Sequence, residues 1–299
     1  MSPLSANQRG ILAIVGCMAS YTVNDVLVKQ IVRNYPIGEV IFVRGIMSTL
    51  LIGAAVVAFG HASELRAAIS ARMSARSVFD GLSTACFVAA LAHMQLANLA
   101  AVLQVAPLII TALSVLFYRE LVGWRRWAAV SVGFLGALFV IKPTPSAFDI
   151  WAVVGMLSAV FAALRELQTR RIDRSVPTLV IAFWGAICIT LFGTLFAVTE
   201  EWRMIARHDL LQLFIASTFV AIAIYLMALG FRGVDLSVVA PFRYSYLLTS
   251  ALGGYLVFGE VPDGWTAVGA VLIVGSGLYA LHRETVRRRD LTGSTTPAA

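Results

Sequence analysis

Ionisable side chains lie within apolar stretches long enough to cross a membrane, and these residues are the ones most able to do chemistry. Asp25 and Lys29 lie four residues apart in the first stretch. An ionised side chain at mid-bilayer costs about 2.5–3.5 kcal/mol on the insertion scale, so each needs a partner or a function. An acidic residue four positions before a basic residue favours an ion pair on one helix. We expect this pair to hold Lys29 near the outer boundary. Asn24 and Asp25 lie deeper and either complete that structural pair or line a binding site.

A second candidate is Arg44, which lies in the next apolar stretch, five residues after Glu39. Five residues turn a helix by about 140°, so the two side chains point to different sides and cannot simply satisfy one another. Arg44 therefore needs an anion from elsewhere, and its planar guanidinium suits a carboxylate. That carboxylate belongs either to a structural partner, Asp25 or Glu39, or to a substrate.

The ninth apolar stretch contains Arg243, Tyr244 and Tyr246 shortly after Pro241. A proline within a helix removes a backbone donor and displaces a preceding carbonyl, which leaves polar backbone to be satisfied by protein, water or ligand. The stretch predicts either a binding site or a kink with Arg243 at the cytoplasmic interface and the tyrosines in the aromatic belt. If the arginines are structural, the site is expected among aromatic and amide residues, namely Phe79, Gln104, Trp184 and Tyr225.

Other polar residues have simpler interpretations. The spacing of Arg76 and Asp80 predicts an ion pair within one helix. Arg165 and Glu166 are expected at the cytoplasmic boundary of the sixth stretch rather than in the site. The three cysteines have no C-x-x-C or histidine spacing, so we expect free thiols. No catalytic residue, metal site or cofactor is predicted.

Ten apolar stretches organise the chain, and each has about the 20 residues that a membrane crossing needs. Hydrophobic residues make up 59% of the 299 residues and charged residues 13%, against roughly 45–50% and 25% in soluble domains. The sequence therefore predicts an all-α integral membrane protein. Its ten transmembrane helices are expected at residues 11–32, 37–59, 77–95, 98–117, 124–141, 149–167, 177–198, 209–229, 235–258 and 264–281.

The positions of Lys and Arg predict the orientation, because positive charges in short loops are retained on the cytoplasmic side. If the N-terminus is inside, fifteen of the 23 Lys and Arg residues lie in cytoplasmic segments and four in external ones. Both termini are therefore expected in the cytoplasm. The net charge of +7 follows from this loop bias and does not indicate nucleic-acid binding.

The two halves of the sequence repeat. Pro36 matches Pro177 at an offset of 141, and the segment ending at Glu120 matches the one ending at Glu260 at an offset of 140. Each half contains five predicted crossings, so the halves are expected to lie upside down relative to each other, with Glu260 facing outside. We predict a first five-helix repeat at 1–141, a second at 142–282, and a basic, then disordered, cytoplasmic tail at 283–299.

Three segments carry a resemblance to a known family. They are PIGEVIFVRG at 36–45, APLIITALSVLFYRELVGWRRWAAVSVGFLGALFVIKP at 106–143, and APFRYSYLLTSALGGYLVFGEVPDGWTAVGAVLIVGSGLY at 240–279. With ten crossings in two halves, the chain resembles the EamA-type members of the drug/metabolite transporter superfamily, which include the YddG-like amino-acid exporters. The resemblance implies that spans 1–4 and 6–9 enclose a central cavity and that spans 5 and 10 pack at the periphery.

By this resemblance, we expect a secondary transporter that moves small metabolites across the bacterial inner membrane by alternating access, with amino acids as the preferred substrates and export as the preferred direction. Its expected partners are a small-molecule substrate and the lipid bilayer, and the protein is expected to be a monomer or a homodimer. The predicted substrate-binding residues are Asn24, Asp25, Arg44, Phe79, Gln104, Trp184, Tyr225, Arg243, Tyr244 and Tyr246.

Three alternatives stay open from the sequence. The first is an uptake carrier for a cofactor-like solute such as S-adenosylmethionine or riboflavin. The second is a membrane enzyme, which the scattered positions of the four histidines disfavour. The third is a scaffold without transport. The inverted repeat argues against the last two, because it supplies the two interchangeable halves that alternating access needs.

Overall fold

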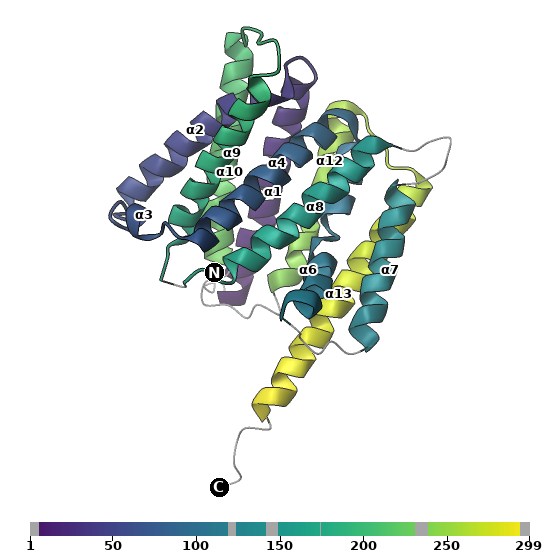
Figure 1. The fold of residues 1–299 in the computed structure, drawn as a ribbon. Coiled ribbons are helices and arrows are strands. Elements are labelled where there is room, and N and C mark those ends of the chain that lie inside the picture. Colours follow the sequence, from purple (N-terminus) through teal and green to yellow (C-terminus); the bar gives the residue numbers. More distant parts are fainter. Residues whose placement is uncertain (1–5, 119–123, 142–148, 174, 231–238, 294–299) are drawn as a thin grey trace, which may run out of the picture.

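A computed structural model describes residues 6–118, 124–141, 149–173, 175–230 and 239–293 of the chain. These residues form helices and connecting turns, with no strand among them (Figure 1). The elements are α1 (Ala6–Val32), α2 (Ile37–Ala58), α3 (Glu64–Ala67), α4 (Ala71–His93), α5 (Leu96–Leu103), α6 (Ala106–Tyr118), α7 (Trp124–Ile141), α8 (Ile150–Thr169), α9 (Thr178–Ala197), α10 (Arg207–Gly230), the 3₁₀ helix η1 (Ala240–Tyr244), α12 (Ser245–Phe258) and α13 (Gly264–Gly293). The predicted all-α class is confirmed.

The helices have the length and surface of membrane spans. Within the described residues, seven helical segments are long and apolar enough to cross a bilayer, and Trp127–Ile141 and Gly264–Ala280 are shorter apolar helices. Large apolar side chains such as Leu50, Leu195 and Leu248 are exposed, as is typical of helices that contact lipid. The count of ten crossings and the cytoplasmic position of both termini stay predictions.

Several helix boundaries differ from the predicted ones for local reasons. α4 begins at Ala71, six residues before the predicted span, because the hydroxyl of Ser70 accepts a hydrogen bond from the Met73 amide at 3.2 Å and caps the helix. The predicted fourth span is two helices, α5 and α6, separated at Gln104 and Val105 just before Pro107, whose ring cannot continue an unbroken helix.

The ninth span is also discontinuous where its proline predicted a break. Pro241 lies in η1, and the α-helical hydrogen-bonding pattern of α12 begins only at Ser245. At the other end of the chain, α13 continues to Gly293, past the predicted end of the last span at 281. The part of the predicted tail up to Gly293 is therefore helical, whereas 294–299 lie outside the described residues.

The packing of the helices has the exchange symmetry that a duplicated fold requires. In the two halves, α1 corresponds to α8 and α4 corresponds to α10. α1 packs against α10, and α4 packs against α8, so replacing each helix by its counterpart turns one pair into the other. α2 packs against α9 and α7 against α13, so each of these pairs is its own counterpart. Figure 1 shows α7 and α13 together at one side of the molecule, the peripheral position that the resemblance implied for spans 5 and 10.

The α7 and α13 pair is close because small residues face each other. A Cβ atom added to Gly136 would lie 2.8 Å from the Gly269 carbonyl oxygen, so a larger side chain there would push the helices apart. Phe139 and Trp265 stack across the same interface with ring centroids 5.5 Å apart. This pair of helices is therefore held by backbone proximity and ring stacking.

Reporter fusions test the predicted orientation. A cytoplasmic reporter should be active when fused after Arg171, and an external reporter should be active after Glu200 and after Lys142, because this arrangement places most positive loop charges inside. Activities measured for both reporter types at each position provide matched controls. A cytoplasmic result after Lys142 would contradict the ten-crossing topology.

Candidate functional site

Four polar residues from three helices meet in the buried part of the bundle. Asn24 and Asp25 come from α1, Arg44 from α2 and Tyr246 from α12, and all four side chains are buried. The Tyr246 hydroxyl donates to Asp25 Oδ2 at 2.6 Å, and Asn24 Nδ2 donates to Asp25 Oδ1 at 2.8 Å. Arg44 Nη1 donates to Asn24 Oδ1 at 3.2 Å. We call this group of four residues the deep cluster.

The Asn24 amide lies between the two charges of the deep cluster. It accepts from Arg44 on its oxygen and donates to Asp25 from its nitrogen. Within the described residues, neither Arg44 nor Asp25 forms an ion pair shorter than 4.0 Å, although they attract each other at longer range. Arg44 Nε is buried and has no hydrogen-bond partner in the described structure. The cluster therefore keeps a buried cation and a buried anion close together without direct pairing.

Contacts between α1 and α12 place Tyr246 beside Asp25. The hydroxyls of Thr22 and Thr249 are hydrogen-bonded at 2.7 Å. A Cβ atom added to Gly253 would lie 3.1 Å from Thr22 Cγ2, so the absence of a side chain lets the two helices approach closely. Tyr246 lies less than one turn before Thr249 on α12, and it is therefore held against the same stretch of α1.

Close packing of α2 on the second half of the chain places Arg44. A Cβ atom added to the neighbouring Gly45 would lie 2.6 Å from Thr190 Oγ1 of α9. On another side, Ser217 Oγ of α10 donates to the Arg44 carbonyl oxygen at 3.4 Å. The backbone around Arg44 is thus fixed by helices of the other half.

A second polar group joins α1 to the end of α12 near the predicted outer surface. Lys29 Nζ lies 2.5 Å from Glu260 Oε1 and donates to the Met94 carbonyl oxygen at 2.6 Å. Glu260 Oε2 accepts from the Leu96 amide at 2.8 Å, and Arg33 Nη2 lies 3.6 Å from Glu260 Oε1. Only 1% of the Lys29 side chain is exposed. The predicted ion pair of Asp25 with Lys29 is wrong, because Lys29 has a carboxylate partner from the second half.

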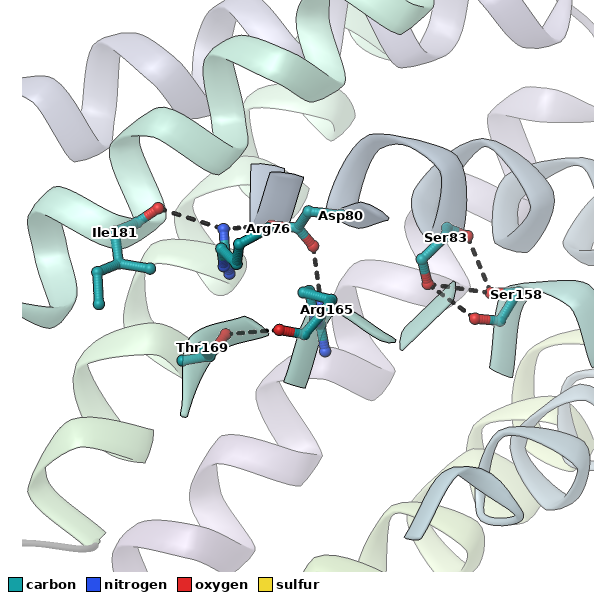
Figure 2. A network of polar contacts seen from close by, with 7 residues as sticks. All are labelled: Arg76, Asp80, Ser83, Ser158, Arg165, Thr169 and Ile181. Atoms are coloured by element: carbon teal, nitrogen blue, oxygen red, sulfur yellow. Dashed lines mark hydrogen bonds and ion pairs between the residues drawn. The ribbon is translucent and has the colours of Figure 1, made fainter. Parts of the chain in front are cut away.

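A third polar group lies near the predicted cytoplasmic ends of α4 and α8 (Figure 2). Arg76 Nη1 contacts Asp80 Oδ2, and Arg165 Nη1 contacts Asp80 Oδ1, each at 2.8 Å. Arg76 Nη1 also donates to the Ile181 carbonyl oxygen of α9 at 3.2 Å. The predicted pair of Arg76 and Asp80 is confirmed. The interpretation of Arg165 as a boundary residue missed its bond to Asp80, which comes from another helix.

The Arg243 side chain forms a separate ion pair with the residue that follows Arg165 on α8. Arg243 Nη1 lies 3.6 Å from Glu166 Oε1, so it is paired with α8 and does not reach the deep cluster. The Arg243 carbonyl oxygen accepts from Gln104 Nε2 at 3.4 Å. Gln104 and Arg243, which come from the broken spans of the two halves, are thus brought together, but apart from Asp25 and Arg44.

The remaining predicted site residues lie elsewhere. Tyr244 points toward α13, where its ring and hydroxyl occupy the space that a side chain on Gly277 would need. Phe79 stacks on Phe161, Trp184 Nε1 donates to the Leu65 carbonyl oxygen at 3.1 Å, and Tyr225 is half-exposed on α10. Of the ten predicted residues, the structure gathers Asn24, Asp25, Arg44 and Tyr246 into one cluster.

Two features of the sequence could have identified the outer pair. The repeat placed Glu260 on the external side, and the position of Lys29 near the end of the first stretch placed it on the same side. The cysteines are free, as predicted, and Cys17 is buried. A surface hollow of about 600 Å³ between the end of α8 and the start of α9 has none of the ten predicted site residues in its lining.

Comparison with known proteins agrees with this architecture. The model of the EamA-like transporter family matches residues 8–142 and again 149–281. A pseudopaline exporter from Pseudomonas aeruginosa is 30% identical over 274 residues, which cover 89% of this chain and 93% of that protein. An S-adenosylmethionine uptake transporter from Rickettsia bellii is 26% identical over 89% of this chain and 91% of its own length.

Two further similarities complete the comparison. A riboflavin transporter from Vibrio cholerae is 32% identical over 63% of each chain. A crystal structure that is 20% identical in sequence superposes with a TM-score of 0.63 over 93% of this chain and 98% of its own, which shows a shared fold. The apolar helices and these relatives indicate a multi-pass protein of the bacterial inner membrane that transports small molecules. The chain belongs to the EamA-like transporter family of the drug/metabolite transporter superfamily.

Proposed function

We propose that the protein is a secondary transporter that exports amino acids or close relatives by alternating access, and that the deep cluster binds their amino-acid group. The observation that supports this most is the separation of Arg44 from Asp25 by the Asn24 amide. A zwitterion carries a carboxylate and an ammonium group a few bonds apart. It can therefore engage the two charges of the cluster at once.

The chemistry of each side chain suits this proposal. Arg44 has a buried Nε without a partner in the described structure, and guanidinium forks bind carboxylates through two parallel hydrogen bonds. Asp25 accepts one hydrogen bond on each oxygen from neutral donors, and each oxygen has a further lone pair for an ammonium group. Burial of a cation that lacks a direct ion-pair partner costs free energy, which favours a role for Arg44 that needs its charge.

The relatives support two directions of transport. The pseudopaline exporter favours export, and it aligns along most of both chains. The S-adenosylmethionine uptake transporters support a second candidate, an uptake carrier, because S-adenosylmethionine also carries an amino-acid group. Both candidates use the same proposed recognition of a carboxylate beside an ammonium group.

Transport into proteoliposomes tests the substrate class. Labelled amino acids should be transported. The matching amines without the carboxylate, and the matching 2-oxo acids without the amine, should compete at least tenfold more weakly, because each leaves one buried charge of the deep cluster unmatched. Empty liposomes are the control, and S-adenosylmethionine and riboflavin complete the panel. Equal competition by amine and amino acid would contradict recognition of the carboxylate.

A further inference from the structure

The third polar group has an unbalanced charge. We define the inner cluster as Arg76, Asp80, Arg165, Glu166 and Arg243. Asp80 pairs with Arg76 and Arg165, and Arg243 pairs with Glu166, the residue that follows Arg165 on α8 (Figure 2 shows the part around Asp80). The cluster contains three guanidinium groups and two carboxylates. Because arginine stays protonated in proteins, the group carries one excess positive charge when both carboxylates are ionised.

The two ends of the inner cluster differ in water access. Arg76 and Asp80 are each about nine-tenths covered, and both Asp80 oxygens are occupied by arginine nitrogens. At the other end, 34% of the Arg165 side chain, 32% of Glu166 and 39% of Arg243 are exposed. The excess charge is therefore accessible at Arg165 and Arg243, while Asp80 is closed to a ligand.

The pairing at the accessible end is weak. Arg243 Nη1 and Glu166 Oε1 are 3.6 Å apart, which is longer than a good charge-assisted hydrogen bond of about 2.7–2.9 Å. Arg165 uses its Nη1 for Asp80, and a guanidinium carries five N–H donors in all. A planar anion can thus bind here without breaking the buried bonds of Asp80.

Tyr21 connects the inner cluster with the deep cluster along α1. It lies within electrostatic range of Arg165, Arg243 and Tyr246. Tyr21 lies four residues before Asp25, a rise of about 6 Å along the helix. The inner cluster and the deep cluster are therefore both within reach of the same stretch of α1.

We propose that Arg165 and Arg243 form a second, anion-binding subsite that takes a carboxylate group of a molecule arriving from the side of the inner cluster. The subsite rests on the proposed function as a transporter, and it adds a preference for substrates with an additional carboxylate beyond the amino-acid group. Binding of one carboxylate neutralises the excess charge of the inner cluster. Glu166 opposes this binding, so it weakens the affinity of the subsite.

Charge-changing variants of the full-length protein in detergent test the proposal. The probe is glutarate, and its neutral isostere glutaramide is the control ligand. The measurement is the ligand concentration that gives half of the maximal rise in unfolding temperature. We expect R165Q and R243Q each to raise this concentration for glutarate roughly tenfold, and E166Q to lower it several-fold. Glutaramide should not raise the unfolding temperature of the parental protein or of any variant. R72Q, which removes an exposed arginine of α4, should have no effect.

Three results would overturn the subsite. The first is equal stabilisation of the parental protein by glutarate and glutaramide. The second is a change in the same direction for R165Q and E166Q, which would indicate general damage rather than charge. The third is loss of the glutarate effect in R44M alone, which would place the anion in the deep cluster. Failure of amino-acid transport in proteoliposomes would refute the proposed function separately, because glutarate binding is measured without transport.

Discussion

Arg44→Met is expected to reduce transport roughly a hundredfold or more while the protein stays folded and inserted. Methionine keeps much of the length of the side chain but removes the charge and the planar fork. Two hydrogen bonds to a carboxylate contribute about 1.5–3 kcal/mol each, and about 3 kcal/mol corresponds to a factor near one hundred. The measurement is the initial rate of labelled amino-acid transport in proteoliposomes, normalised to the amount of inserted protein.

Two variants control this experiment. Arg44→Lys keeps the positive charge without the fork, so partial activity is expected from it. Arg72→Met removes an exposed arginine and should transport at the parental rate. If Arg44→Met and Arg243→Met both transport at the parental rate, the arginines are structural. The binding residues must then be sought among the aromatic and amide residues Phe79, Gln104, Trp184 and Tyr225.

Glu260→Leu is expected to lower the free energy of unfolding by about 3–5 kcal/mol, the second large effect. Lys29 is almost fully buried, and this change removes its only carboxylate partner within the described residues. The Met94 carbonyl oxygen still accepts a hydrogen bond from Lys29, but it does not neutralise the charge. The measurement is reversible unfolding of the purified protein in mixed micelles.

The double variant Lys29→Met with Glu260→Leu is the matched control. Replacing a whole buried ion pair by apolar residues is often neutral, so the double variant should recover most of the lost stability. A double-mutant cycle then gives a large coupling energy between the two positions. If the losses of unfolding free energy in the two single variants simply add in the double variant, the two residues are not coupled.

The sequence was sufficient to predict features that depend on neighbouring residues. The helices follow from long apolar stretches, because a backbone in lipid must satisfy its own hydrogen bonds. The pair of Arg76 with Asp80 follows from a spacing of four on one helix. The 3₁₀ segment at Pro241 lies where the sequence predicted a disturbed helix, because proline lacks a backbone donor.

Partners from distant helices could not be predicted in this way. The partner of Lys29 is 231 residues away, and a favourable local spacing to Asp25 suggested the wrong carboxylate. Arg165 likewise bonds Asp80 across 85 residues. These pairs depend on which helices pack together, and spacing within one helix contains no information about that packing.

The sequence also could not predict which side of each apolar helix faces the interior of the bundle. Trp184 and Tyr225 lie in spans that are apolar on all sides, because lipid is as apolar as the protein interior. No pattern in α9 or α10 therefore separates a residue facing the bundle from one facing the bilayer. The structure places Tyr225 half-exposed on α10 and directs Trp184 toward α3.

The neutral amide between Arg44 and Asp25 has a consequence for the energetics of the transport cycle. The two fixed charges of the deep cluster cancel, and a zwitterion bound between them adds no net charge. Moving one elementary charge through a membrane potential of 100 mV is worth about 2.3 kcal/mol, but a loaded deep cluster of this composition moves none. For a substrate with no charge beyond the zwitterion, voltage would then neither drive nor oppose the loaded step, and the concentration gradient of the solute would set the direction of net flow.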